Sequence, residues 1–130
     1  MRGIAIALIC LATSQAAAAE RLSGDEVRSY IFGAHLFGTV EGTDQPWNEC
    51  IEPDGSTVYQ IAGERVGGQA TVDGIGRACF IYPHSGSQSC FFVERVGGKI
   101  VFQSTGATIR FRVDRDVRPI KECDGTVPLS

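Results

Sequence analysis

Hydrophobic and polar residues alternate with a period of two over most of the chain, beginning at His35. This period places successive side chains on opposite faces of a β-strand. Pairs such as Asp54-Gly55 and Gly97-Gly98 interrupt the alternation, and they favour the tight turns of β-hairpins. The pattern predicts eight strands, at residues 35–41, 48–52, 56–62, 68–73, 77–82, 87–96, 99–104 and 107–114.

The alternation is clearest in the last of these strands. It predicts that Ile109, Phe111 and Val113 point into a core, while the charged residues between them face water. Short, evenly spaced strands joined by tight turns are typical of an antiparallel up-and-down meander. We therefore expect a mainly β protein whose strands close into a small barrel or fold into a sandwich.

A helical period precedes the strands, between Leu22 and Phe32. Ser23 and Glu26 have the spacing of a capping box, which marks the start of a helix. The apolar residues that follow recur at helical spacing and form a single stripe. Such a short helix is unstable alone, so we expect it to dock on an apolar surface of the β domain.

The first residues of the chain have the composition of a secretory signal peptide. Arg2 supplies a positive charge, residues 4–11 are apolar, and a run of alanines ends at Ala19. The apolar stretch is too short to span a membrane, and Cys10 lacks the small preceding residues of a lipid-attachment site. We expect cleavage near Ala19, a periplasmic or secreted product, and a single domain over residues 20–130.

The most specific local signal is a hairpin whose turn lies at residues 83–86. Counting outward from that turn places Cys79 directly opposite Cys90. Directly opposed residues have Cβ atoms about 4.5–5.5 Å apart, which a small adjustment brings within disulfide reach. Of the five cysteines, four follow the expected cleavage site. An even number in an exported chain favours disulfides over metal ligation, so the remaining two, Cys50 and Cys123, are expected to pair. The second disulfide would hold a C-terminal tail of irregular structure.

Composition and motifs exclude several classes of function, and they indicate none directly. The net charge of −3 at pH 7 makes non-specific binding to nucleic acid unfavourable. The sequence contains no nucleophile elbow, no zinc-binding His-Glu-x-x-His and no phosphate-binding glycine loop. The chain is therefore predicted to be a non-enzymatic binding or accessory protein without a cofactor or a metal, one that presents loops to a partner protein from a rigid scaffold.

An acidic stretch around the only tryptophan is the candidate for such a contact. It contains no Lys or Arg, and a clustered charge beside an aromatic anchor suits an electrostatically steered interface with a basic partner. The alternatives are that these residues are ordinary solvated surface, or that Trp47 belongs to the core. The candidate binding residues are Glu41, Asp44, Trp47, Glu49, Glu52 and Asp54.

Two other binding functions are compatible with the same scaffold. A small acidic disulfide-bonded β domain is similar in size and compartment to inhibitors of basic extracytoplasmic enzymes such as lysozyme. A barrel of about eight strands is also just wide enough to hold one small apolar ligand. The aromatic residues that could line its interior are Phe80, Phe91, Phe92, Phe102 and Phe111.

Three short motifs give the chain a family likeness. It has a Leu-Ser-Gly-Asp-Glu-Val helix start at residues 22–27, a Pro-Asp-Gly hairpin at residues 53–55, and the cysteine hairpin formed by Cys79 and Cys90. In these motifs the chain resembles a loose family of small uncharacterised periplasmic proteins from bacteria. The resemblance implies export and a β architecture, and it implies no catalytic residues.

Overall fold

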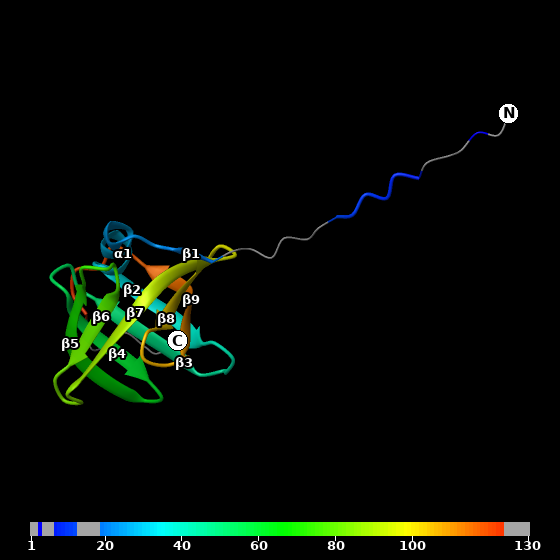
Figure 1. Ribbon diagram of the computed structural model, residues 1–130. Helices are drawn as coiled ribbons and strands as arrows, with labels where there is room; N and C mark the ends of the chain where they lie inside the picture. Colours follow the sequence, from blue (N-terminus) through cyan, green and yellow to red (C-terminus); the bar gives the residue numbers. More distant parts are fainter. Residues whose placement is uncertain (1–2, 4–6, 13–18, 124–130) are drawn as a thin grey trace.

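The computed structural model describes residue 3, residues 7–12 and residues 19–123, and its described part is dominated by a closed antiparallel barrel. Eight strands form the barrel in sequence order, and β8 closes it by pairing with both β7 and β9 (Figure 1). The meander of eight strands predicted from the sequence is confirmed, and it closes as a barrel. The strands are β2 (Ala34–Val40), β3 (Pro46–Ile51), β4 (Ser56–Ile61), β5 (Glu64–Val72), β6 (Ala78–Tyr82), β7 (Ser87–Val96), β8 (Lys99–Ser104) and β9 (Arg110–Val117).

The last strand differs from its prediction in its start and its end. β9 begins at Arg110 and runs to Val117, rather than over residues 107–114. Ile109 was predicted to face the core, and this is wrong, because it precedes the strand and is 47% exposed. Phe111 packs against the core and Val113 is buried, as the alternation predicts.

A bulge interrupts the β2–β9 ladder. The register changes between Phe37 and Gly38, so that Phe37 pairs with Arg115 and Gly38 with Val113. A Cβ atom on Gly38 would lie only 1.7 Å from the Arg112 carbonyl oxygen. The strands approach so closely that only glycine fits here.

Both predicted disulfides are confirmed. Cys79 pairs with Cys90 in the ladder between β6 and β7, and their Cα atoms lie 4.1 Å apart. Cys50 on β3 bonds to Cys123, which lies 73 residues further along the chain. The residues before Cys123 lie beside the barrel, because the Ile120 amide donates to the Gly33 carbonyl at 2.8 Å. Residues 124–130, the rest of the predicted tail, lie outside the described part of the chain.

The predicted helix is α1 (Gly24–Ile31), and it lies at one end of the barrel (Figure 1). Its capping box is complete, because the Ser23 side chain accepts from the Glu26 amide and the Glu26 side chain accepts from the Ser23 amide. Val27 and Ile31 are fully buried in the barrel core. This burial, rather than helix propensity, stabilises so short a helix.

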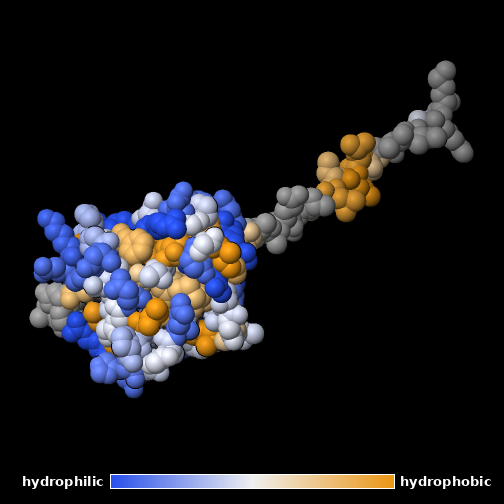
Figure 2. Space-filling model, turned by 60° about the vertical axis from the view of Figure 1, so that its left-hand side comes forward, coloured by the Kyte–Doolittle hydropathy of each residue, from blue (hydrophilic) through white to orange (hydrophobic). Residues whose placement is uncertain are grey.

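The N-terminal residues lead into the barrel through a short ninth strand. β1 (Glu20–Arg21) pairs with Glu94 and Arg95 of β7, beside the end of the β6–β7 ladder. Residues 7–12 extend away from the barrel (Figures 1 and 2), and Leu8, Ile9 and Leu11 are exposed. Most of the predicted signal peptide lies outside the described residues, so the cleavage near Ala19 stays a prediction. No helix in the described part of the chain is long and apolar enough to cross a membrane.

Candidate functional site

The interior of the barrel contains a cavity of about 580 Å³. This volume lies within the range of roughly 300–1,000 Å³ that is usual for small-molecule sites. The inward-facing positions of seven strands, all except β5 among the eight of the barrel, supply most of its wall, as the period of two requires. Its apolar lining consists of Leu36, Trp47, Phe80, Phe91, Phe102 and Phe111.

The rings of the lining support one another edge to face. Phe111 meets both Trp47 and Phe91 at ring-centroid distances of 5.6 Å and with nearly perpendicular planes. Phe91 packs on Phe102 in the same manner, at 6.2 Å. Edge-to-face pairs are a favoured aromatic geometry and hold each ring in place. The cavity therefore has a rigid aromatic wall.

Four of the five phenylalanines expected inside the barrel line this cavity, and the fifth does not. Phe92 pairs with Gln103 on the outward-facing positions of β7 and β8, and the Arg21 guanidinium stacks over its ring at 3.6 Å. The prediction for Phe92 was wrong because Phe91 and Phe92 are adjacent in one strand, and adjacent side chains point to opposite faces.

The cavity opens where the ladder between β7 and β8 ends. β7 pairs with β8 only from Phe91 onward, and the Cys90 carbonyl accepts from the Thr105 amide and hydroxyl, whereas residues 87–89 pair with β6 alone. The segment between β8 and β9 lies opposite this unpaired edge of β7. We call this opening the mouth, and its residues are Gln88, Ser89, Cys90, Ser104, Thr105, Gly106, Ala107 and Ile109.

Halfway along β3, a carboxyl group faces into this aromatic cavity. Glu49 is only 5% exposed. Its Oε1 atom accepts a hydrogen bond from the Tyr82 hydroxyl at 2.5 Å, and its Oε2 atom lies 2.6 Å from the Thr57 hydroxyl. We call Glu49, Thr57, Tyr59 and Tyr82 the inner polar cluster. Strands β4 and β6 therefore place polar groups around one buried acid on β3.

Burial controls the ionisation of this cluster. Desolvation raises the pKa of Glu49 to about 8, although the hydrogen bonds from Thr57 and Tyr82 partly oppose the shift. Desolvation and the nearby Glu49 carboxyl raise the pKa values of Tyr59 and Tyr82 as well. All three groups are therefore mostly protonated at neutral pH.

Two polar groups of the cavity wall have no hydrogen-bond partner in the described part of the chain. Trp47 Nε1 is buried without an acceptor. The Tyr59 hydroxyl, on a residue directly paired with Glu49, makes no hydrogen bond there either. Buried polar groups in native proteins are almost always satisfied. Among the described residues, Trp47 Nε1 is such an exception, whereas Tyr59 is half-buried. Unpartnered polar groups in a cavity wall are typical of groups that bind a ligand.

A second polar row lies on the outward-facing side of β2, β3 and β4. The His35 Nε2 atom donates to Asn48 Oδ1 at 2.8 Å, and Asn48 Nδ2 donates to Gln60 Oε1 at 3.4 Å. We call these three residues the outer polar row. All three are buried, and burial lowers the pKa of His35. Each member has a hydrogen-bond partner within the row, so a structural role accounts for all three residues.

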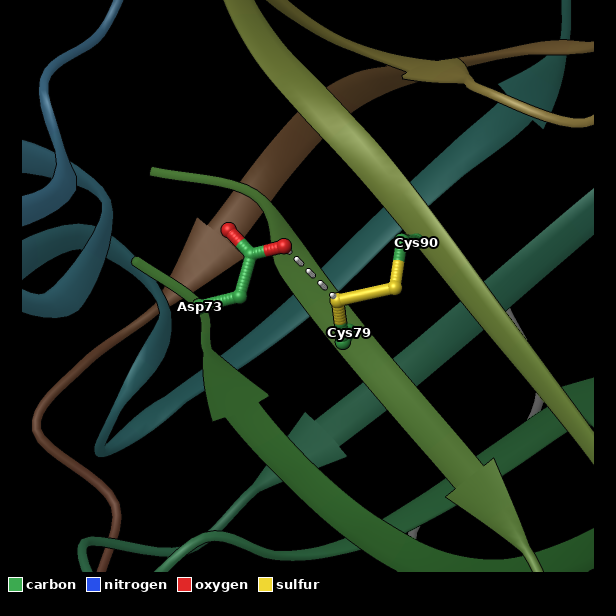
Figure 3. Close-up of side chains that lie close together, drawn as sticks. All are labelled: Asp73, Cys79 and Cys90. Atoms are coloured by element: carbon green, nitrogen blue, oxygen red, sulfur yellow. Dashed lines mark hydrogen bonds between the residues drawn. A yellow bond between two sulfur atoms is a disulfide. The ribbon is translucent and has the colours of Figure 1, made fainter. Parts of the chain in front are cut away.

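One cluster has a composition that suits a metal ion. Asp73 lies beside the disulfide of Cys79 and Cys90, with its Oδ2 atom 3.9 Å from the Cys79 sulfur (Figure 3). Cysteine binds metals as the thiolate, and both sulfurs are held in the disulfide. Asp73 is also engaged by the Arg77 guanidinium at 2.6 Å. In this oxidised form the disulfide links β6 to β7, and Asp73 orders the β5–β6 turn by accepting from the Arg77 amide and guanidinium.

The six candidate binding residues do not share one surface. Trp47 and Glu49 are buried and line the cavity. Glu41 and Asp44 lie in the β2–β3 turn, whereas Glu52 and Asp54 lie in the β3–β4 turn at the opposite end of β3. Six strand residues separate the two turns by roughly 20 Å. A single acidic patch around an exposed tryptophan is therefore not formed.

The sequence-based candidates missed most of the inner polar cluster. Thr57, Tyr59 and Tyr82 were not singled out, although Thr57 and Tyr59 alternate with Val58 in a predicted strand. The alternation of β3 also placed Trp47 and Glu49 on the same face. The cluster could not be predicted because its members come from three strands, and the register of those strands decides which side chains meet.

Comparisons of the chain with models of protein families, with curated proteins and with solved structures each found no match.

Proposed function

We propose that the protein is a non-enzymatic binding protein that holds one small, mainly apolar molecule inside its barrel. The observation that supports this most directly is the rigid aromatic cavity of about 580 Å³, which opens through a mouth and contains unpartnered polar groups. A preformed apolar cavity with a few convergent polar groups is the usual form of a small-molecule site. An apolar ligand would gain affinity by burial against the phenylalanine rings.

The compartment in which it acts is part of the proposal. Disulfides persist in oxidising environments outside the cytoplasm, and the chain carries two. Together with the predicted signal peptide, they support action in the periplasm or outside the cell. A carrier in such a compartment would shield an apolar molecule from water.

Contact with a partner protein, including inhibition of a basic enzyme, stays a prediction. Asp44 and Asp54 are exposed in the turns at the two ends of β3 and remain available for separate contacts. Glu41 pairs with Arg110 at 3.0 Å, and Glu52 is half-buried and accepts a hydrogen bond from the Cys123 amide at 2.9 Å. The cavity has more specific features than either turn, so we place small-molecule binding first.

Binding of the uncharged dye N-phenyl-1-naphthylamine, whose emission increases in apolar surroundings, tests the proposal. We expect saturable enhancement with the wild-type protein. Ser89→Trp should weaken it by about ten-fold or more, because Ser89 pairs with the inward-facing Phe80 and a large ring there would fill the cavity.

Ile81→Trp is the matched control. Ile81 lies on the neighbouring strand with its side chain exposed on the outside of the barrel, so this variant should bind the dye as the wild type does. No enhancement by the wild-type protein, or equal loss in the two variants, would overturn the proposed function.

A further inference from the structure

The inner carboxyl group lacks the counter-charge that a buried acid normally has. Glu49 is the one acid among the described residues that line the cavity, and no Lys, Arg or His of the described chain pairs with it. The only basic residue of the lining, Arg77, already pairs with Asp73. Buried carboxyl groups are rarely tolerated unless they are paired or protonated.

Hydrogen counting indicates which of these two states the unliganded protein adopts. The Thr57 hydroxyl has one hydrogen and two neighbouring oxygens, the Cys50 carbonyl at 2.8 Å and Glu49 Oε2 at 2.6 Å. A carbonyl can only accept. If Glu49 is protonated on Oε2, it donates to Thr57, Thr57 donates to Cys50, and Tyr82 donates to Oε1. Every contact is then satisfied by a neutral carboxyl group.

The surroundings of this carboxyl group suit a cation. Tyr59 faces it from β4 and Tyr82 from β6, while its neighbour on β2 is the apolar Leu36. No other titratable side chain in the described chain faces it from these strands. Tyrosine rings are electron-rich and attract ammonium groups, and the Tyr59 hydroxyl, which has no partner in the described chain, can accept a hydrogen bond.

On these grounds, and resting on the proposed binding function, we infer that the ligand is an apolar amine whose ammonium group pairs with Glu49. The phenylalanine end of the cavity holds the apolar body of the molecule. An organic acid is disfavoured, because its carboxylate would face the Glu49 carboxyl and the tyrosine rings without a cation. A neutral molecule of the same shape gains the apolar contacts and lacks the ion pair.

The exchange of charge is balanced by one proton. As the ammonium enters, Glu49 loses the proton on Oε2 to the solvent, and the Thr57 hydrogen becomes available to the carboxylate. Because burial holds the pKa of Glu49 near 8, this deprotonation costs about a factor of ten in affinity at pH 7. Amine affinity should therefore rise between pH 6 and pH 8.

Three probes with the same phenyl ring and similar length separate the ligand classes: 2-phenylethylamine, 2-phenylethanol and 3-phenylpropionate. Isothermal titration calorimetry at pH 7 should show the amine binding about ten-fold or more tightly than the alcohol, and no binding of the propionate. Titrations in two buffers of different ionisation enthalpy should reveal the release of close to one proton per amine bound. The proton count needs no variant.

Glu49→Gln supplies the matched variant, because glutamine has the shape of the neutral carboxyl group and cannot form the ion pair. We expect it to bind 2-phenylethylamine and 2-phenylethanol equally, while dye binding by the wild type reports separately on the broader binding function. Equal binding of amine and alcohol by the wild type, an amine preference kept by Glu49→Gln, or no proton release would each overturn the inference. Retained dye binding in those cases would leave the broader binding function standing.

Discussion

The two faces of strand β3 bury polar groups in opposite ways. Asn48 points outward and joins the outer polar row, where His35, Asn48 and Gln60 satisfy one another across three strands. Glu49, the next residue, points inward to a cavity, where Tyr59 and Trp47 keep unpartnered donors in the described chain. A closed network rigidifies a fold, whereas an open one beside a cavity is suited to binding. Adjacent residues thus serve stability on one face and recognition on the other.

The largest expected effect comes from removing the disulfide at Cys50, which tests whether the outer face of β3 serves stability and not binding. Cys50 lies on the outward-facing side of β3, paired with His35 in the ladder. Its bridge closes 73 residues, so removing it in Cys50→Ala/Cys123→Ala should lower the free energy of unfolding by about 4 kcal/mol. Urea denaturation measures this change, and affinity for the naphthylamine dye should be unaltered below the unfolding transition.

The second disulfide is the control for that experiment. Cys79→Ala/Cys90→Ala opens a loop with a sequence separation of only 11 residues, and its expected loss is about 3 kcal/mol. A larger loss from the short loop than from the long one would contradict this account of the outer face.

The pH dependence of the free energy of unfolding reports on the ionisation of Glu49 in the inner polar cluster. The folded-state pKa of Glu49 is raised to about 8 from an ordinary value of 4.5, so the folded state retains a proton that the unfolded state loses. The resulting stabilisation is complete at low pH and is lost as the pH rises toward 8. Relative to Glu49→Gln, the wild type should lose about 3 kcal/mol of stability between pH 5.5 and pH 8.

The wild type must be compared with Glu49→Gln because the ionisation of His35 changes stability with pH in the opposite direction. Burial lowers the pKa of His35, so its contribution to stability is lost as the pH falls below the ordinary value of 6.5. Both proteins contain His35, and its effect cancels in the difference. A difference that does not change with pH would show that the inner carboxyl group is ionised throughout.

Asn48→Ala tests the outer polar row with a smaller expected effect. It leaves the His35 Nε2 donor and the Gln60 side chain without their shared partner, and such losses cost about 2 kcal/mol. Thermal unfolding at neutral pH measures the change. Glu49→Gln at pH 5.5 is the neighbouring control, expected within about 0.5 kcal/mol of the wild type. Equal effects at the two positions would remove the distinction between the faces.

The sequence predicted the fold well because its signals are local. The turn at residues 83–86 set the register that pairs Cys79 with Cys90, and Ser23 with Glu26 marked the helix start. The end of β9 was mispredicted, and the bulge opposite Gly38 was missed because it depends on the approach of another strand. Such a feature has no signature within the strand that it shifts.

The site was harder to predict because its charge pattern was misleading. Glu49 lies within a run of acids along the chain, and this run suggested a common acidic surface. Alternation within β3 turns Trp47 and Glu49 inward and leaves the other acids in turns at its two ends. In a β protein, charged residues that are close in sequence are therefore predicted to be close in space only within a turn. Within a strand, alternate residues point to opposite faces, so neighbours in sequence are separated.

The position of α1 at one end of the barrel has a kinetic consequence. With Val27 and Ile31 of the helix packed in the core, a captured molecule departs by the passage through which it arrived. Gly106 and Ala107 border that passage. Bulkier side chains there that do not touch the bound molecule would slow association and dissociation by the same factor. The residence time would then lengthen while the equilibrium affinity stays unchanged.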